Sequence, residues 1–316
     1  TINIFSDGTV SAQAALTSIE IANIYDEDVS LNLTTSTSLT EVNFTRGDGI
    51  AAYTVGAAVT TVGLTDIVLA GTGNGTADTT LTLAAADTAV ILNLSGITSA
   101  AGNTDEDINV IGAGLTDITI NAVGATEADN IDVAGAATIA VVATKAFDAV
   151  LDTSSTVAAL TLTGAGAITL GVLDTGIDSV DASGATGAIT MTDGGANADA
   201  IITLGSGADV FTTDDDGFAT TDLYAVSGGE GTDTLVVAAA ADLNTTAEGA
   251  RFTNFDTVRL VASQDMDMIS GITAIQLGTA SSKSFTDLTA VQAAAIQVRG
   301  DQTSSTIALK TATGTS

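Results

Sequence analysis

The most distinctive polar segment of the chain is GGEGTDTLVV, residues 228–237. It fits the nonapeptide G-G-x-G-x-D-x-U-x, which binds calcium in parallel β-helices. The glycines permit positive φ angles and leave backbone carbonyls accessible, and the aspartate supplies a hard anionic oxygen of the kind that Ca²⁺ prefers. The segment therefore predicts a calcium-binding turn followed by a strand whose Leu235 faces the core. Its candidate ligand positions are Gly228, Gly229, Gly231 and Asp233.

Two related segments precede this one, GGANADAII at 194–202 and LGSGADVFT at 204–212, and a run of three acids follows them. Asparagine suits the fourth position of the first segment because it tolerates left-handed backbone angles. The candidate ligand positions are Gly194, Gly195, Asn197 and Asp199 in the first segment, Gly205, Gly207 and Asp209 in the second, and Asp214, Asp215 and Asp216 in the acidic run.

Each such nonapeptide forms half a coil, so successive turns lie on opposite edges and alternate turns stack. We therefore expect turns 194 and 204 on opposite edges, turn 204 stacked on turn 228, and turn 194 stacked on the acidic run at 213–217. The step of 24 residues from Asp209 to Asp233 exceeds an ideal of about eighteen, and the acidic loop absorbs the excess. The alternative is that these aspartates only accept backbone N–H groups, as in Asx-turns.

Acidic residues outnumber basic ones by 38 to seven, which gives a formal net charge of −31. Such a chain repels nucleic acid and anionic lipid. Many of the acids form short clusters beside turn residues, where like charges repel unless counter-ions lie between them. Ca²⁺ is therefore the expected cofactor. The further clusters are Asp26, Glu27 and Asp28; Asp105, Glu106 and Asp107; and Asp265 with Asp267.

The elements that must position these turns are short strands. Apolar segments of roughly five to seven residues recur every nine to twelve, separated by Gly, Asn, Asp, Ser and Thr. Segments such as GAATIAVV, GAGAITLG and GATGAITM are variants of one theme at irregular spacing. This pattern predicts a mostly β chain, an elongated parallel β-solenoid with a calcium-binding β-roll segment and coils of different length. A β-sandwich array is the alternative, but it favours stricter alternation and an aromatic core.

The solenoid is expected to run through the whole chain as one elongated domain. Residues 1–60 form an N-terminal β cap or the start of the solenoid, 61–240 form the solenoid with the calcium turns at 194–236, and 241–316 continue as a β region. Thr289 followed three residues later by Gln292 is a capping box, which predicts a short helix over 290–294 and a return to strand at 296–298. Thr1 and Ser316 are expected to be cut ends of a larger or processed chain.

Several classes of protein are excluded or disfavoured. The chain has no Cys, His or Pro. The lack of Cys excludes disulfides and thiolate metal sites, and the lack of His excludes histidine metal sites and Ser-His triads. No apolar run is long enough for a membrane span. A β-helical polysaccharide lyase or hydrolase would use basic groups and aromatic platforms, whereas seven cations, three tyrosines and no Trp are present. We therefore expect a protein without enzymatic activity.

The segment from about 120 to 260, with DSVDASGATGAITM, LGSGADVFTT, SGGEGTDTLVV and FTNFDTVRL, resembles the repeat-in-toxin (RTX) surface-layer proteins of Gram-negative bacteria. The resemblance covers a little under half of the chain by motif. It implies export by type I secretion, calcium-dependent folding outside the cell, and assembly into a two-dimensional coat. The long perfect nonapeptide arrays of that family are missing, since only three units are recognisable.

Two functions of different classes follow. The first is a structural, self-assembling subunit of a calcium-dependent surface layer or surface filament, located outside the cell, with copies of itself as partners and a cell-surface polysaccharide as anchor. The second is a module of a large secreted RTX adhesin that binds a surface or glycan. Faces rich in Ala and Thr without aromatic residues favour broad contacts between identical copies over a concentrated ligand pocket.

Overall fold

The computed structural model describes residues 1–5, 15–25, 30–47, 51–69, 78–99, 107–153, 158–194, 199–213, 223–238, 243–278, 280–281 and 283–310. The chain is mostly β and forms a parallel β-solenoid of about 12 turns with little helix. The expected solenoid is therefore confirmed. The chain divides into two compact units, Thr1–Ile177 and Asp178–Ser316, which are described in turn. The divisions expected at residues 60 and 240 stay a prediction.

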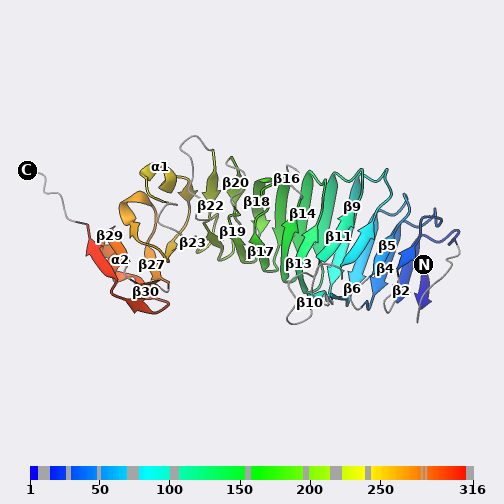
Figure 1. Ribbon diagram of the computed structural model, residues 1–316, viewed down its shortest axis with the longest axis horizontal. Coiled ribbons are helices and arrows are strands. Elements are labelled where there is room, and N and C mark those ends of the chain that lie inside the picture. Colours follow the sequence, from blue (N-terminus) through cyan, green and yellow to red (C-terminus); the bar gives the residue numbers. More distant parts are fainter. Residues whose placement is uncertain are drawn as a thin grey trace, which may run out of the picture. The chain divides into compact units, whose positions relative to one another are not determined.

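The first unit consists of parallel strands that alternate between two sheets, so that each coil adds one strand to each sheet (Figure 1). The strands of sheet A are β1 (Ile2–Phe5), β2 (Ile21–Tyr25), β4 (Glu41–Thr45), β6 (Thr61–Thr65), β9 (Ala89–Ser95), β12 (Asp117–Ala122), β14 (Thr138–Ala143) and β16 (Ala158–Gly164). The strands of sheet B are β3 (Leu31–Asn32), β5 (Ala52–Thr54), β8 (Thr79–Thr82), β11 (Asp107–Ile111), β13 (Thr126–Asp132), β15 (Phe147–Asp152) and β17 (Ile168–Val172). A small separate pair consists of β7 (Val68–Leu69) and β10 (Thr98–Ser99).

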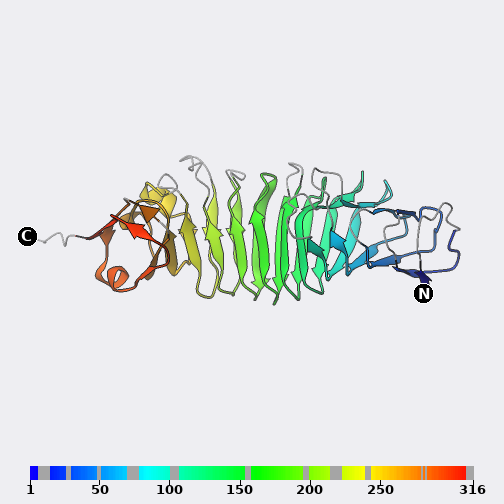
Figure 2. The ribbon, with the colours of Figure 1, turned by 60° about the horizontal axis from the view of Figure 1, so that its bottom comes forward.

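The second unit is also built of parallel strands in two main sheets, and its strands after β18 have two to five residues each (Figure 2). One sheet contains β18 (Ile177–Ala185), β20 (Ile201–Thr203), β22 (Ala225–Ser227) and β24 (Phe252–Thr253). The other contains β19 (Ile189–Thr192), β21 (Val210–Thr212), β23 (Thr234–Val237), β25 (Thr257–Leu260), β27 (Ala274–Leu277) and β30 (Ile296–Val298). Towards the C-terminus a third sheet contains β26 (Gln264–Asp265), β29 (Ser284–Leu288) and β32 (Thr306–Leu309), and a pair contains β28 (Ala280–Ser281) and β31 (Gln302–Thr303).

Alternation of side chains along each strand builds the core. In β12 and β14 every second residue is buried, and the in-register pairing of the two strands places Ile118 on Ile139 and Ile120 on Val141. These β-branched side chains fit a pleated, half-buried surface. The core is thus a set of apolar columns that run from coil to coil, which explains why a chain with few aromatic residues can fill it.

Polar columns run along the outer faces in the same way. Asn23 donates from Nδ2 to Oδ1 of Asn3 at 2.8 Å, and Asn43 donates to Asn23 at 3.0 Å. Further along, Asn121 donates to Asn93 at 2.8 Å. An amide carries both a donor and an acceptor, so identical side chains in register satisfy one another. These ladders stabilise the register of successive coils.

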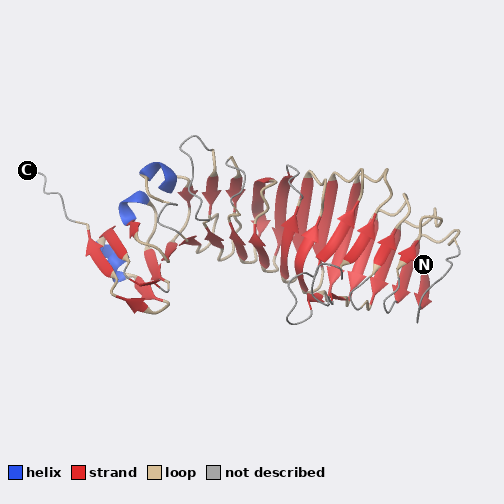
Figure 3. Cartoon of the chain, in the orientation of Figure 1, coloured by secondary structure: helices blue, strands red, loops and turns tan. Residues whose placement is uncertain are grey.

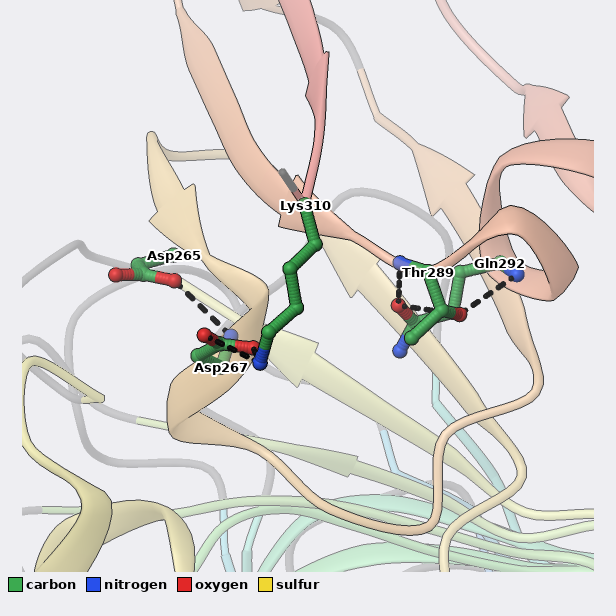
Figure 4. Close-up of polar contacts among 5 residues, drawn as sticks. All are labelled: Asp265, Asp267, Thr289, Gln292 and Lys310. Carbon is green, nitrogen blue, oxygen red and sulfur yellow. Dashed lines mark hydrogen bonds and ion pairs between the residues drawn. The ribbon is translucent and has the colours of Figure 1, made fainter. Parts of the chain in front are cut away.

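Helices are few and short (Figure 3). They are α1 (Thr246–Gly249), the 3₁₀-helix η1 (Met266–Met268) and α2 (Ala290–Ala294). The expected helix is confirmed as α2: Thr289 and Gln292 form both bonds of the capping box, and β30 follows (Figure 4). Among the described residues, no helix has the length and apolar character needed to cross a membrane.

Candidate calcium-binding turns

The turns at 204–209 and 228–233 lie one above the other. They precede β21 and β23, which pair in register with Phe211 beside Leu235, and Leu235 is buried as expected. A Cβ atom at Gly229 would overlap the carbonyl oxygen of Gly205, so this close approach requires glycine. Gly229 also has a φ angle of 88°, which glycine adopts without strain. The predicted stacking of turn 204 on turn 228 is confirmed.

Turn 204–209 leads from β20 to β21 and therefore from one sheet to the other. The placement of turn 194 on the opposite edge depends on residues 195–198, which lie outside the described residues, and it stays a prediction. Of the first segment and the acidic run, Gly195, Asn197, Asp214, Asp215 and Asp216 lie outside the described residues, as do residues 26–28, 105 and 106. The stacking expected between turn 194 and 213–217 also lies there. Gly194 and Asp199 are described, and Asp199 accepts the backbone N–H of Leu223 at 3.0 Å.

Three aspartates form a ladder through the stacked turns. Asp209 accepts two backbone N–H groups, that of Ile189 on Oδ1 at 2.8 Å and that of Gly205 on Oδ2 at 2.9 Å. Asp233 accepts the N–H of Asp209 on Oδ1 at 2.9 Å, and Asp256 accepts the N–H of Asp233 at 3.1 Å. Each carboxylate therefore links its own coil to the backbone of the preceding one. Sequence reasoning missed Asp256, because no glycine pattern precedes it.

The two stacked turns differ in how their carboxylates are satisfied. In turn 204–209 the N–H of Gly205 reaches Asp209, but in turn 228–233 the equivalent N–H of Gly229 reaches Ser227 Oγ at 3.3 Å. As a result, Oδ2 of Asp233 has no hydrogen-bond partner, although Asp233 is only 1% exposed. A buried carboxylate oxygen without a donor is costly, and a cation can remove that cost.

The pKa values of Asp209 and Asp233 reflect the burial and the hydrogen bonds of their carboxylates. Burial raises the pKa of Asp209, and the N–H groups of Ile189 and Gly205 oppose the shift. Burial also raises the pKa of Asp233 to about 6; the N–H of Asp209 opposes this, while the charges of Asp209 and Asp256 add to it. Ionised Asp233 is therefore destabilised at neutral pH in the protein without metal. Bound Ca²⁺ would favour the ionised form.

These contacts bear on both interpretations of the turns. Asp209 already satisfies two backbone donors, as the Asx-type alternative expects, whereas Asp233 retains one unpaired oxygen. Among the described residues no group of three or more Asp, Glu, His or Cys side chains is arranged to hold a metal ion. A calcium ion at Asp233 would thus take one carboxylate oxygen together with backbone carbonyls of the glycine turns, as hard oxygen ligands do. Calcium binding stays a prediction.

A second acidic cluster lies on the outer face of sheet B in the first unit. Asn109 donates to Asp78 at 2.9 Å, and Asn130 donates to Asp107 at 3.0 Å. Asp132 lies beside Asn109 and Asp152 in the strand register, and its pKa is raised to about 6, mainly by burial and further by the charges of Asp107, Asp152 and Asp78. Of this cluster only Asp107 was anticipated. The others escaped notice because unequal coil lengths separate residues that are adjacent in register.

Replacing Asp132 with Asn should stabilise the first unit at pH 7. A carboxyl whose pKa is higher in the folded than in the unfolded chain favours folding below its unfolded value, and this contribution is lost as the pH rises through about 6. D132N should therefore raise the free energy of unfolding by on the order of 1 kcal/mol at pH 7, after allowance for solvent screening, and by almost nothing at pH 4. Denaturation followed by circular dichroism at both pH values measures this. D117N is the charge-matched control at an exposed position, and an equal gain in D117N would contradict the prediction.

No protein-family model matches the chain, and comparison with curated proteins and with solved structures gives no significant match. The fold that the RTX resemblance implies is present as a β-solenoid. The family itself is not identified.

Proposed function

We propose that this chain is a structural, self-assembling extracellular protein, the subunit of a calcium-dependent bacterial surface layer or surface filament of the RTX type. The observation that carries the proposal is the repetition of one coil: parallel strands stack in register and present rows of short polar side chains on the outer faces. Such faces suit broad contacts between identical copies.

The stacked turns support the calcium requirement of the proposal. Asp233 has an unpaired buried oxygen beside the glycine turn, and the chain as a whole carries −31. Copies with that charge repel one another unless cations lie between them. Secretion, location at the cell surface and a polysaccharide anchor belong to the proposal through the RTX resemblance. Catalysis has no part in it, because the chain lacks His and Cys and has only seven basic residues.

Light scattering and electron microscopy of the purified chain, with calcium and with a chelator, test the proposal. We expect ordered sheets or bundled filaments in millimolar calcium, because divalent ions link acidic faces that monovalent salt only screens. A chain that forms no ordered array in calcium would contradict the proposal and favour the adhesin module. Electron microscopy of the native cell surface tests the same point in place.

A further inference from the structure

The outer face of sheet A in the first unit has an uncharged region over the neighbouring strands β6, β9, β12, β14 and β16, which Figure 1 shows side by side. The in-register pairing of these strands arranges their outward side chains in two adjacent columns, which we call the uncharged face. All of its residues except Gly63 are half-buried or exposed. The first column contains Thr61, Ile91, Thr119, Ala140 and Thr161, and the second contains Gly63, Asn93, Asn121, Val142 and Thr163.

Sheet B of the same unit is acidic by contrast. No Lys or Arg lies on β8, β11, β13 or β15. Like charges on such a surface repel an identical surface unless cations lie between them. The first unit therefore has one sheet that repels a second copy and one that offers an uncharged surface to it. The half-buried or exposed acids in or beside the strands of sheet B are Asp78, Asp107, Glu127, Asp129, Asp132, Asp148 and Asp152.

The side chains of the uncharged face are short and carry both methyl and hydrogen-bonding groups. Ile91 is 39% exposed and Val142 is half-buried, so apolar atoms reach the surface. Asn121 donates from Nδ2 to Oδ1 of Asn93 at 2.8 Å. An amide has two N–H groups and two lone pairs, so each of these side chains can make further hydrogen bonds across a contact. The face can thus bury methyl groups and satisfy its amides together.

The regularity of this face indicates what fits on it. Neighbouring strands lie about 4.8 Å apart, and successive outward residues of one strand lie about 6.6 Å apart. A second copy of the same face repeats at both spacings, so its rows of short side chains can enter the spaces between these rows. No aromatic side chain is present to stack on a sugar ring. Additional coils of a solenoid stack on strand edges, so they lengthen such a face without covering it.

We propose that the uncharged face binds the same face of a second copy across a two-fold axis. The proposal rests on the proposed self-assembly and assigns one of its contacts. Because the same surface is used by both copies, the contact is isologous and forms a closed dimer. It requires no calcium. The calcium of the proposed function then links dimers to one another through the acidic groups.

The size of the face predicts a weak dimer. Strands about 4.8 Å apart and about five residues long give the five strands an area of roughly 24 by 17 Å, or about 400 Å² on each copy. A total of about 800 Å² is below the size of a standard stable interface, about 1,200–2,000 Å². The dimer should therefore form at high protein concentration. Sodium chloride should strengthen it, because each copy carries −31 and salt screens the repulsion.

Cysteine cross-linking detects a contact of this strength. The chain has no Cys, so each variant T61C, T119C and T161C has one thiol, placed in the first column of the uncharged face. In chelator and about 0.5 M NaCl, a short bis-maleimide should cross-link at least one of them about tenfold faster than T80C. Thr80 is half-buried on the outer face of sheet B and is the control. Rates are divided by the rate with a monofunctional maleimide, which corrects for thiol reactivity. Equal corrected rates for all four variants would overturn the proposal.

Sedimentation velocity under the same conditions tests the contact without a cross-linker. The wild type should approach twice the monomer mass and stop there, because the contact is closed. T119E/A140E should stay monomeric, since facing glutamates would be buried without cations. I111E/V172E adds the same charge to sheet B strands at positions that are each 53% exposed, and it should dimerise like the wild type. Circular dichroism checks that both variants fold.

The outcomes separate this contact from the proposed function. A wild type that stays monomeric in chelator at all concentrations but forms arrays in calcium would overturn the contact and leave the proposed function standing. Dimers without arrays in calcium would refute the proposed function and support the contact. Dimers of T119E/A140E that form as readily as those of the wild type would show that another surface of the chain associates, which contradicts the proposal.

Discussion

Removing calcium should strongly reduce hydrogen-exchange protection across residues 194–236 while the strands of the first unit remain protected. The free energy of metal binding contributes directly to the folding of the segment that supplies the ligands. In that segment Asp233 is buried with one unpaired oxygen, and the charges of Asp209 and Asp256 lie beside it. We expect exchange rates to rise by about 100-fold, which corresponds to roughly 2.7 kcal/mol of lost ligand stabilisation.

Three amides report this change most directly. The N–H groups of Ile189 and Gly205 donate to Asp209, and the N–H of Asp209 donates to Asp233. Amides of β12 and β14, far from these turns in the sequence, are the internal control. Sodium at matched ionic strength replaces calcium in a second control, because general screening should not restore the protection. Equal protection of the three amides with calcium and with chelator would show that the carboxylates only cap backbone donors.

The fold could be predicted because its determinants are local. Short apolar segments between turn residues specify strands, and their near-repetition specifies stacking, so the solenoid and the burial of Leu235 followed from the sequence. The glycine spacing around residues 205 and 229 likewise predicted which turns would stack. The capping box at Thr289 predicted α2, but the same spacing from Thr245 to Glu248 also forms a box and caps α1, which was not anticipated.

Features that depend on register could not be predicted. The coils differ in length: Asp78 and Asn109 are 31 residues apart, Asp107 and Asn130 only 23, and yet both pairs are hydrogen-bonded. A constant repeat would have revealed which carboxylates share a face, whereas unequal connections conceal it. The orientation of a carboxylate is equally hidden, since the sequence does not show whether Asp209 faces a cation or the backbone of the preceding coil. It accepts two N–H groups in the structure.

In millimolar calcium the wild type should form ordered arrays, and the variant D209N/D233N should not. The variant carries two fewer negative charges, so a mechanism based on overall charge predicts that it assembles better. Calcium held by carboxylate and carbonyl oxygens links groups locally, whereas sodium only shortens the screening length, to about 10 Å at 0.1 M salt. Sodium at matched ionic strength should therefore produce no ordered arrays. D117N/D148N removes the same charge at exposed sites and should form arrays like the wild type.

The single variant D233N gives the sharper result. The substitution D209N removes an acceptor for one of two buried N–H groups, so it destabilises the turn whether or not calcium binds. The substitution D233N keeps Oδ1 as the acceptor for the N–H of Asp209 and replaces only the oxygen that has no partner. Loss of the buried charge stabilises the folded chain, whereas the unpaired amide destabilises it. The free energy of unfolding in chelator should therefore change by less than about 1 kcal/mol. Arrays should nevertheless be lost. If D233N assembled in calcium as well as the wild type or better, charge neutralisation would be the driving force and a specific site at Asp233 would be wrong.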